Sequence, residues 1–274
     1  MEREMNNIVL DYPTSSRNEP RYTSSNPNKY LKALLDTGRY KYRAVLKTFS
    51  QYFELLEKID SEGDPGSNRP YYLNSWLPGL DCVSLYGIIA EIKPRIYMEV
   101  GSGISTKFAR RAVDDFGLST KIISIDPSPR SEVAGICDTI FPSALEDVDL
   151  SLFDTLGEND ILFIDNSHRS FMNSDVTVCF MDLMPRLSRG AYLHLHDICW
   201  PLDYPKSWTE RYYNEQYLLG AMLANGPTNY DILLPNYYIS KEPELMEIIE
   251  PLWASNKKFS GVQKQGCGFW MVKK

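Results

Sequence analysis

All three histidines of the 274-residue chain lie in two short segments, and each segment also contains an aspartate. His168 follows Asp165 by three positions, and His194, His196 and Asp197 occupy the second segment. A histidine titrates near neutral pH, and an adjacent carboxylate can orient its ring and stabilise its charged form. The pairs of His168 with Asp165 and of His196 with Asp197 are therefore candidates for orienting or deprotonating a reacting group.

Alternation along a predicted strand separates the two histidines of the second segment. Tyr192, His194 and His196 would share one face of this strand, and only His196 reaches its carboxyl end. We therefore interpret His194 as a hydrogen-bonded interior residue. We predict catalytic roles for His168, His196 and Asp197.

A glycine turn lies earlier in the chain, after the apolar segment 96–100. Gly101 and Gly103 form this turn, which leads into a helical segment. Only a residue without a Cβ lets the backbone turn sharply and lie against a ligand. Asp126 ends the next apolar segment, about 25 residues later, where an open parallel sheet places a carboxylate that accepts both hydroxyl hydrogens of a ribose. The pattern predicts a nucleoside site for an unphosphorylated ribose.

The residues of the turn favour a cationic nucleoside over a dinucleotide. A dinucleotide turn requires a third glycine where this chain has Thr106, and Glu99 would repel a bound pyrophosphate. Both features argue against a nicotinamide-dependent oxidoreductase. The sulfonium and ammonium groups of S-adenosylmethionine are positive, so an acid here favours that ligand. For Ser105, which opens the helix, we favour a role as N-cap over direct ligand contact.

These segments resemble those of class I S-adenosylmethionine-dependent methyltransferases. The run from Glu99 to Gly103 resembles the first motif of that family, and Asp126 resembles its ribose acid. Residues 160–168 and 189–197 are similar to the fourth-strand and fifth-strand motifs of bacterial small-molecule and sugar O-methyltransferases. Arg189 replaces the first glycine of the pair that usually opens the fifth strand. The resemblance extends from about residue 95 to the C-terminus.

Alternating strands and helices predict an α/β fold with a doubly wound, mostly parallel sheet. The predicted strands are 96–100, 121–126, 139–141, 161–165, 191–196, 230–238 and 268–272. The resemblance implies a seven-stranded Rossmann-like sheet whose last strand enters antiparallel between the fifth and the sixth. The functional residues would then lie at the carboxyl ends of the strands.

The resemblance implies a set of residues that bind the methyl donor. The adenine pocket of this fold is usually completed near the third strand, where Ser143 and Ala144 are the candidates. Asp165 would border the reaction centre. The expected donor-binding residues are Glu99, Gly101, Gly103, Ser105, Asp126, Ser143, Ala144 and Asp165.

A divalent metal ion is an alternative use of the same acids and histidines. Asp165, His168, His196 and Asp197 offer enough oxygen and nitrogen donors to hold an ion that binds an acceptor diol and lowers its pKa. The better-known metal-dependent O-methyltransferases follow the fifth-strand acid with a second ligand, often Asn or Asp, where this chain has Ile198. We therefore favour catalysis without a metal ion.

The chain divides into three predicted parts. Residues 1–28, rich in Ser, Asn, Pro and Arg, predict a flexible N-terminal arm, and residues 29–93 predict a helical extension. Residues 94–274 form the predicted methyltransferase domain. Within the extension, apolar residues at helical spacing predict an amphipathic helix. These residues are Tyr42, Leu46, Phe49, Phe53, Leu56 and Ile59.

Two aromatic segments flank the predicted site. Residues 71–77 are interpreted as a hydrophobic bridge between the extension and the domain. Residues 198–217 form an aromatic loop and helix that we interpret as a lid over the acceptor. Its charged residues Asp203, Lys206 and Arg211 could select polar substituents.

Composition excludes several classes of function. The chain has 29 basic and 36 acidic residues, a net charge of −7, and so no broad attraction to nucleic acid or anionic lipid. Its five cysteines are dispersed, which indicates reduced thiols in a cytoplasm. No apolar run is long enough to span a membrane, and the N-terminus lacks the apolar core of a signal peptide. We expect a cytoplasmic protein with a small-molecule acceptor, no nucleic-acid or membrane partner, and a homodimer surface on the helical extension.

The predicted function is transfer of a methyl group from S-adenosyl-L-methionine to a hydroxyl of a sugar or natural-product intermediate. In such an in-line displacement the protein mainly positions the acceptor and takes its proton. Two alternatives remain at this stage. One is metal-assisted O-methylation, and the other is a non-catalytic relative that binds the nucleoside.

Overall fold

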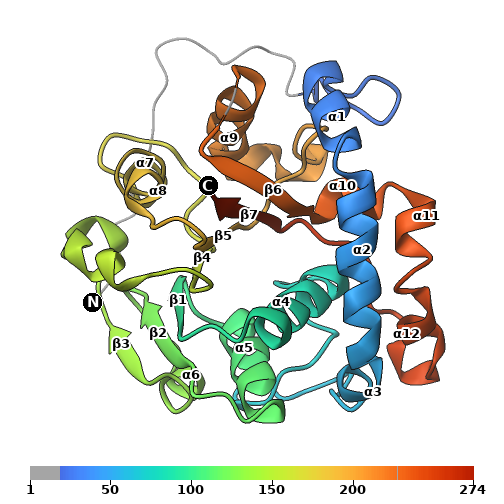
Figure 1. Ribbon diagram of the computed structural model, residues 1–274, viewed down its shortest axis with the longest axis vertical. Helices are drawn as coiled ribbons and strands as arrows, with labels where there is room; N and C mark the ends of the chain where they lie inside the picture. Colours follow the sequence, from blue (N-terminus) through green and yellow to red (C-terminus); the bar gives the residue numbers. More distant parts are fainter. Residues whose placement is uncertain (1–18, 227) are drawn as a thin grey trace.

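A seven-stranded sheet forms the centre of the computed structural model, which describes residues 19–226 and 228–274 (Figure 1). The strands lie in the order β3-β2-β1-β4-β5-β7-β6. Neighbours pair in parallel except β7, which is antiparallel to both β5 and β6. This arrangement confirms the predicted fold class. The strands are β1 Ile96–Val100, β2 Lys121–Ile125, β3 Thr139–Phe141, β4 Ile161–Ile164, β5 Tyr192–Leu195, β6 Tyr230–Pro235 and β7 Phe269–Lys273.

Helices cover both faces of the sheet. Figure 1 shows α4 and α5 on one side and α7, α8 and α9 on the other. All residues of β1 and β4 are therefore buried, as continuous apolar sequence at the centre of a parallel sheet requires. The α-helices are α1 Lys29–Asp36, α2 Arg39–Phe49, α3 Phe53–Leu56, α4 Gly79–Ile92, α5 Ile104–Asp115, α6 Ser131–Ala134, α7 Asp175–Val178, α8 Met184–Arg186, α9 Glu215–Ala224, α10 Asn236–Ser240, α11 Pro243–Met246 and α12 Glu250–Ala254.

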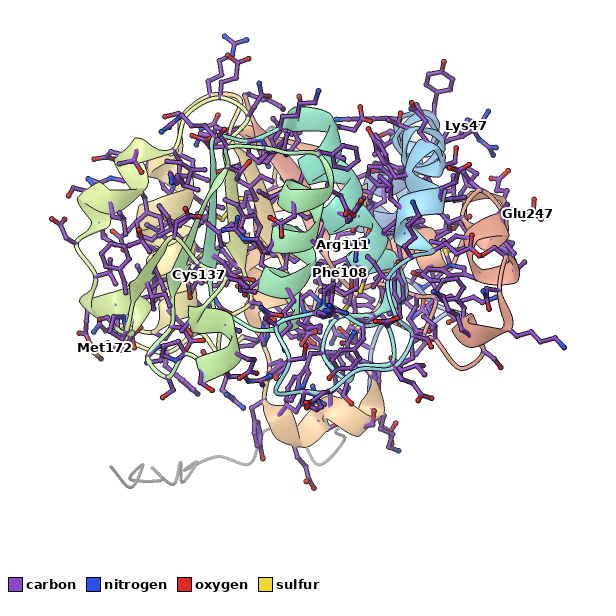
Figure 2. All side chains as sticks on the ribbon, turned by 90° about the horizontal axis from the view of Figure 1, so that it is seen from below. Lys47, Phe108, Arg111, Cys137, Met172 and Glu247 are labelled. Atoms are coloured by element: carbon purple, nitrogen blue, oxygen red, sulfur yellow. The ribbon has the colours of Figure 1, made fainter. Side chains whose placement is uncertain are left out.

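Helix α4 is buried almost all round because α2 covers the side that faces away from the sheet. A Cβ at Gly87 would lie 2.3 Å from the ring of Phe49, so the glycine lets the two helices approach closely. Figure 2 shows the packing of the neighbouring helix, with Phe108 of α5 inside the molecule and Lys47 and Met172 at its periphery. The buried position of α4 matters for the site because it carries an acid, Asp81, into the interior.

Two predicted elements differ from the structure. The helix expected over residues 42–59 is broken, because Ser50–Tyr52 is a 3-10 turn between α2 and α3. The sixth strand, expected to reach residue 238, ends at Pro235, and α10 begins at the next residue. The chain turns there because Asn236 points inward. Its backbone N–H donates to Gly268 O, and its side-chain Nδ2 donates to Asp81 Oδ1 in the interior.

The predicted flexible arm falls mostly on residues 1–18, which lie outside the described residues. The adjoining residues are tied to the loop that follows β5. The backbone N–H groups of Arg21 and Tyr22 donate to Asp203 Oδ2 at 2.6 and 3.0 Å, and that of Asn28 donates to Pro201 O at 2.9 Å. The division of the chain at residues 28 and 93 stays a prediction.

No helix among the described residues has the length and apolar character needed to cross a bilayer.

A buried carboxylate joins the beginnings of β1 and β4. Asp160 accepts hydrogen bonds from Ile96 N at 2.7 Å, Gly157 N at 2.9 Å and Arg95 Nη2 at 2.7 Å. We expect Asp160→Ala to lower the free energy of unfolding by about 2–4 kcal/mol, because it leaves buried donors unpaired. Urea denaturation measures this loss. The exposed Asp154→Ala serves as the control, and equal stability of both variants would contradict the role given to Asp160.

Candidate active site

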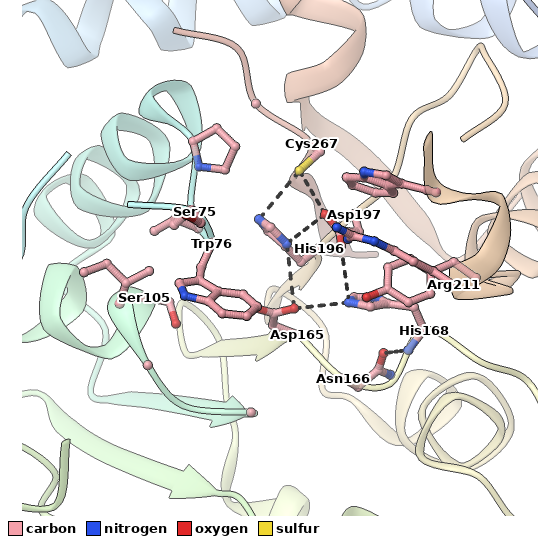
Figure 3. Close-up of a pocket in the computed structure, with 18 of the residues that line it drawn as sticks. Ser75, Trp76, Ser105, Asp165, Asn166, His168, His196, Asp197, Arg211 and Cys267 are labelled. Carbon is pink, nitrogen blue, oxygen red and sulfur yellow. Dashed lines mark hydrogen bonds and ion pairs between the residues drawn. The ribbon is translucent and has the colours of Figure 1, made fainter. Parts of the chain in front are cut away.

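A cavity of about 400 Å³ opens at the carboxyl ends of the parallel strands (Figure 3). In open α/β sheets this edge is where ligands bind. The structure brings most of the predicted site residues onto its wall. They are Gly101, Gly103, Ser105, Asp126, Asp165, His168, His196 and Asp197.

The glycine turn forms one side of the cavity and packs against the end of β4. Gly101 has a φ of +79°, and a Cβ there would lie 2.0 Å from the backbone oxygen of Asp165. No other residue type fits both this conformation and this approach. Asp126 lies beside the turn, where Ser102 donates its N–H and its hydroxyl to Oδ2, each at 2.9 Å. The turn and the acid after β2 therefore form one unit.

Glu99 lies beneath the turn and is not part of the cavity wall. It is fully buried and accepts hydrogen bonds from Ser105, Thr106 and Tyr97. Burial raises the pKa of the Glu99 carboxyl to about 7, against the opposing effect of these hydrogen bonds. Thr106, which replaces the third glycine of a dinucleotide turn, also accepts a hydrogen bond from Gly103 N at 3.0 Å.

Two further expectations about donor binding concern Ser105 and the residues that follow β3. The interpretation of Ser105 as an N-cap is wrong, because α5 begins at Ile104 with Gly103 as its N-cap, and the Ser105 hydroxyl donates to Glu99. Ser143 and Ala144 follow β3 but do not line the cavity. Their contact with a donor stays a prediction.

His168 lies between three carboxylates at the end of β4. Its Nε2 is 3.3 Å from Asp165 Oδ1 and 3.5 Å from Asp197 Oδ2, and its Nδ1 is 2.9 Å from Glu215 Oε2. Burial lowers the pKa of His168, but the hydrogen bonds to Asp165 and Glu215 outweigh this and raise the pKa well above its usual value. The three carboxylates thus favour the protonated form of the ring.

His196 extends the same network to the other side of the cavity. Its Nδ1 is 3.3 Å from Asp197 Oδ1 and 3.7 Å from Asp165 Oδ1. Burial lowers the pKa of His196, whereas Cys267, Asp165 and Asp197 raise it well above its usual value. Burial also acts to raise the pKa of Asp197, but the two histidines lower it below its usual range. Asp197 is thus held as a carboxylate between two imidazoliums.

His194 takes no part in this network and lies in the interior. It is stacked on Phe163, with ring centroids 3.8 Å apart. Burial lowers the pKa of His194 well below its usual value, so its ring is neutral.

The lid segment contributes some of its predicted residues to the cavity. Trp208, Arg211 and Tyr213 line the wall, with the Arg211 guanidinium 4.4 Å from the ring centroid of Trp208. Asp203 and Lys206 do not line the cavity, and their selection of acceptor substituents stays a prediction. Asp203 binds the N-terminal segment through backbone N–H groups, and Lys206 pairs with Glu19.

Trp76 also lines the cavity, and its side chain is 64% exposed. Arg130 lies 5.6 Å from the centroid of its ring. Within residues 71–77, Tyr72 and Leu77 are buried, as a hydrophobic bridge requires, whereas the exposed Trp76 does not fit that interpretation.

Sequence reasoning missed three buried residues that contact the histidines. Glu215 lies at the start of α9, Asp81 in the first turn of α4, and Cys267 just before β7. No local pattern marks them, because none of the three follows a predicted parallel strand of the site. Only the fold brings them to the cavity.

The structure also changes which residues could hold a metal ion. The four residues proposed for it pair with one another as ions. Within residues 19–226 and 228–274 the donor atoms that converge as a metal site would are instead those of Asp81, His196 and Cys267.

The contact of Glu215 with His168 can be tested by NMR, because the chain has three histidines whose ring signals can be assigned. We expect the His168 signal to stay that of an imidazolium through neutral pH, and Glu215→Gln to lower its titration midpoint by about one pH unit or more. Glu250→Gln, at an exposed ion pair, should leave it unchanged. If the titration midpoint of His168 is unaltered in Glu215→Gln, the Glu215 carboxylate does not stabilise the protonated His168 ring.

Three solved structures illustrate how distant the similar folds are. An S-adenosylhomocysteine-bound methyltransferase from Podospora anserina, PaMTH1, is 17% identical, with a TM-score of 0.43, over 71% of this chain and 78% of that one. Coclaurine N-methyltransferase bound to N-methylheliamine is 7% identical, with a TM-score of 0.36, over 89% and 93%. The branched-chain polyamine synthase of Thermus thermophilus is 10% identical, with a TM-score of 0.40, over 79% and 66%.

No match to this chain was found among curated proteins. A family model described as a methyltransferase domain matches residues 98–198. This segment runs from β1 to the end of β5 and carries the glycine turn, Asp126, His168 and His196. Residues 98–198 are thus similar to a methyltransferase domain, and they lie in a sheet with the strand order that the resemblance implied.

Proposed function

We propose that the protein transfers a methyl group from S-adenosyl-L-methionine to a hydroxyl group of a small molecule. One observation carries the proposal. A single cavity joins the glycine turn and Asp126 on one side to the carboxylates and imidazoliums of Asp165, His168 and Asp197 on the other. Donor-binding and acceptor-binding features are thus within one ligand-sized space.

The first side of the cavity fits a nucleoside. The Asp126 carboxylate already accepts hydrogen bonds from Ser102 and from Ser128 N, which orient it, and its remaining lone pairs can accept two ribose hydroxyls. Gly101 and Gly103 present backbone without side chains to the ligand. When bound, S-adenosylmethionine supplies an electrophilic methyl group on a sulfonium.

The second side fits a hydroxyl acceptor. A carboxylate of Asp165 or Asp197 can accept the hydrogen of that hydroxyl and so orient its oxygen toward the donor. As the oxygen gains positive charge during transfer, the same carboxylates stabilise it and take up the proton. Because the neighbouring carboxylates favour the protonated rings of His168 and His196, we assign these residues to orienting the carboxylates rather than to removing the proton.

The cavity wall suggests the size and kind of acceptor. Trp76, Trp208 and Tyr213 offer flat surfaces that suit a sugar or an aromatic ring, and Arg130 and Arg211 offer hydrogen-bond donors for its polar substituents. A net charge of −7 disfavours nucleic acid as acceptor. We also propose a reducing compartment such as the cytoplasm, since the five cysteines are free thiols. A homodimer through the helical extension stays a prediction.

Donor binding is tested by calorimetric titration with S-adenosylmethionine and S-adenosylhomocysteine. We expect both compounds to bind the wild-type protein and Asp126→Ala to weaken both by about tenfold or more, because it removes the acceptor of the ribose hydrogens. The exposed Asp182→Ala should bind like wild type. Failure of the wild-type protein to bind either compound would overturn the proposed function, and binding without turnover of any acceptor would favour a non-catalytic relative.

The pKa of Glu99 predicts how donor affinity depends on pH. Because a cationic donor favours the ionised carboxylate, affinity for S-adenosylmethionine should increase as pH rises through about 7. The gain between about pH 6 and about pH 8 is at most about tenfold for one ionising group. Glu99→Gln should remove this dependence. The same slope in wild type and variant, measured by titration at each pH, would assign it to another group.

A further inference from the structure

We propose that Asp81, His196 and Cys267 bind a divalent cation that prefers sulfur ligands, such as Zn²⁺. The three residues come from distant parts of the chain, namely the first turn of α4, the end of β5 and the loop before β7. Figure 3 shows His196 and Cys267 pointing toward each other at the side of the cavity. This inference does not depend on the proposed function.

The distances between the three donor atoms fit a shared ion. Asp81 Oδ2 is 3.5 Å from His196 Nε2 and 3.6 Å from Cys267 Sγ, and Sγ is 3.8 Å from Nε2. Zinc bonds to oxygen, nitrogen and sulfur place tetrahedral ligand atoms about 3.4–3.6 Å apart. The distance of 3.5 Å is too long for a good N–H···O hydrogen bond.

Hydrogen bonds and ion pairs within the group account for only part of this convergence. The thiol of Cys267 has one hydrogen, yet two acceptors, Asp81 Oδ2 and Asp197 Oδ1, lie within reach of its sulfur, at 3.6 and 3.2 Å. At most one of these acceptors can be served at a time. An ion bound to the sulfur, to Nε2 and to the Asp81 oxygen would use all three donor atoms at once.

Neighbouring groups orient these ligands as they do around known metal sites. Asp81 Oδ1 accepts hydrogen bonds from Asn236 Nδ2 at 2.7 Å and Gly268 N at 2.9 Å, and Oδ2 accepts one from Cys267 N at 2.8 Å. A lone pair on Oδ2 stays available. Nδ1 of His196 faces Asp197 Oδ1 at 3.3 Å, so when the ring loses a proton to the incoming ion, the proton on Nδ1 can stay with Asp197 and Nε2 can bind the ion. Such a carboxylate behind a ligating histidine is the usual arrangement.

Charge and burial also favour an ion at this point. Asp81, His196 and Cys267 are 1%, 2% and 8% exposed. A carboxylate, a thiolate and a neutral imidazole balance the two charges of Zn²⁺, so the loaded centre is neutral, as a buried site requires. The thiolate selects zinc over magnesium or calcium. Loading releases the protons of the thiol and of the imidazolium.

The fourth position of the ion would face the cavity. His196 and Cys267 line the cavity wall, whereas Asp81 lies behind them. Three protein ligands with one open position are typical of catalytic rather than structural zinc sites. An oxygen or sulfur atom of an acceptor can take that position, on the opposite side of His196 from Asp165 and His168.

The experiment uses the full chain, freed of metal by a chelator and titrated with Co²⁺ and then Zn²⁺ in the absence of any methyl donor. We expect one equivalent of Co²⁺ to give the thiolate-to-cobalt charge-transfer absorption of a tetrahedral site, and Zn²⁺ to abolish it. Cys267→Ser should lose this absorption and bind Zn²⁺ at least about tenfold more weakly. Cys137→Ser, which changes a partly exposed thiol elsewhere, should behave like wild type.

Circular dichroism shows whether Cys267→Ser folds. If it folds poorly, the cobalt spectrum of the wild-type protein alone still tests the proposal. Absence of a charge-transfer band from the wild-type protein, or its persistence in a folded Cys267→Ser variant, would overturn the proposal. Because no methyl donor is present, failure of the metal site and failure of donor binding are separate results.

Discussion

The carboxyl edge of this sheet depends on the pairing of buried charge. Four acids, of which Asp81 and Glu215 are fully buried and Asp165 and Asp197 partly so, surround the rings of His168 and His196, and a buried charge without a partner would be costly. Each partner comes from a different element. The network therefore fixes the ends of β4 and β5 relative to α4 and α9, and with them the shape of the cavity.

The same pairing changes the chemistry that histidine can perform here. A histidine near neutral pH usually exchanges protons, but one held between carboxylates keeps its proton and acts as a fixed cation. His168 has this character, and His196 shares it unless a metal ion takes the place of its proton. The carboxylates between the two rings are left as the groups that can meet a hydroxyl. Buried Glu99 beneath the turn adds a further acid that a cationic ligand would favour.

Sequence patterns predicted those parts of the site whose residues directly follow a recognisable strand. The glycine turn, the acids after β2, β4 and β5, and two of the histidines follow strands whose apolar runs are easily recognised, so their meeting at one edge follows from parallel pairing. Glu215 and Cys267 could not be found this way, because their contacts with histidines depend on tertiary packing across 47 and 71 residues of chain. The early end of β6 has the same cause, since Asn236 turns inward to donate to Asp81.

The bond between the N-terminal segment and Asp203 has a consequence for how the molecule assembles. Arg21 and Asp203 are separated by 182 positions, so the first described residues contact a loop that is synthesised much later. Closing so long a stretch of chain is slow and costs entropy, and it gains little until β5 and the residues after it are in place. The wall formed by Trp208 and Arg211 follows this loop directly. The cavity wall therefore depends on contacts between distant parts of the chain, as the sheet does through β7.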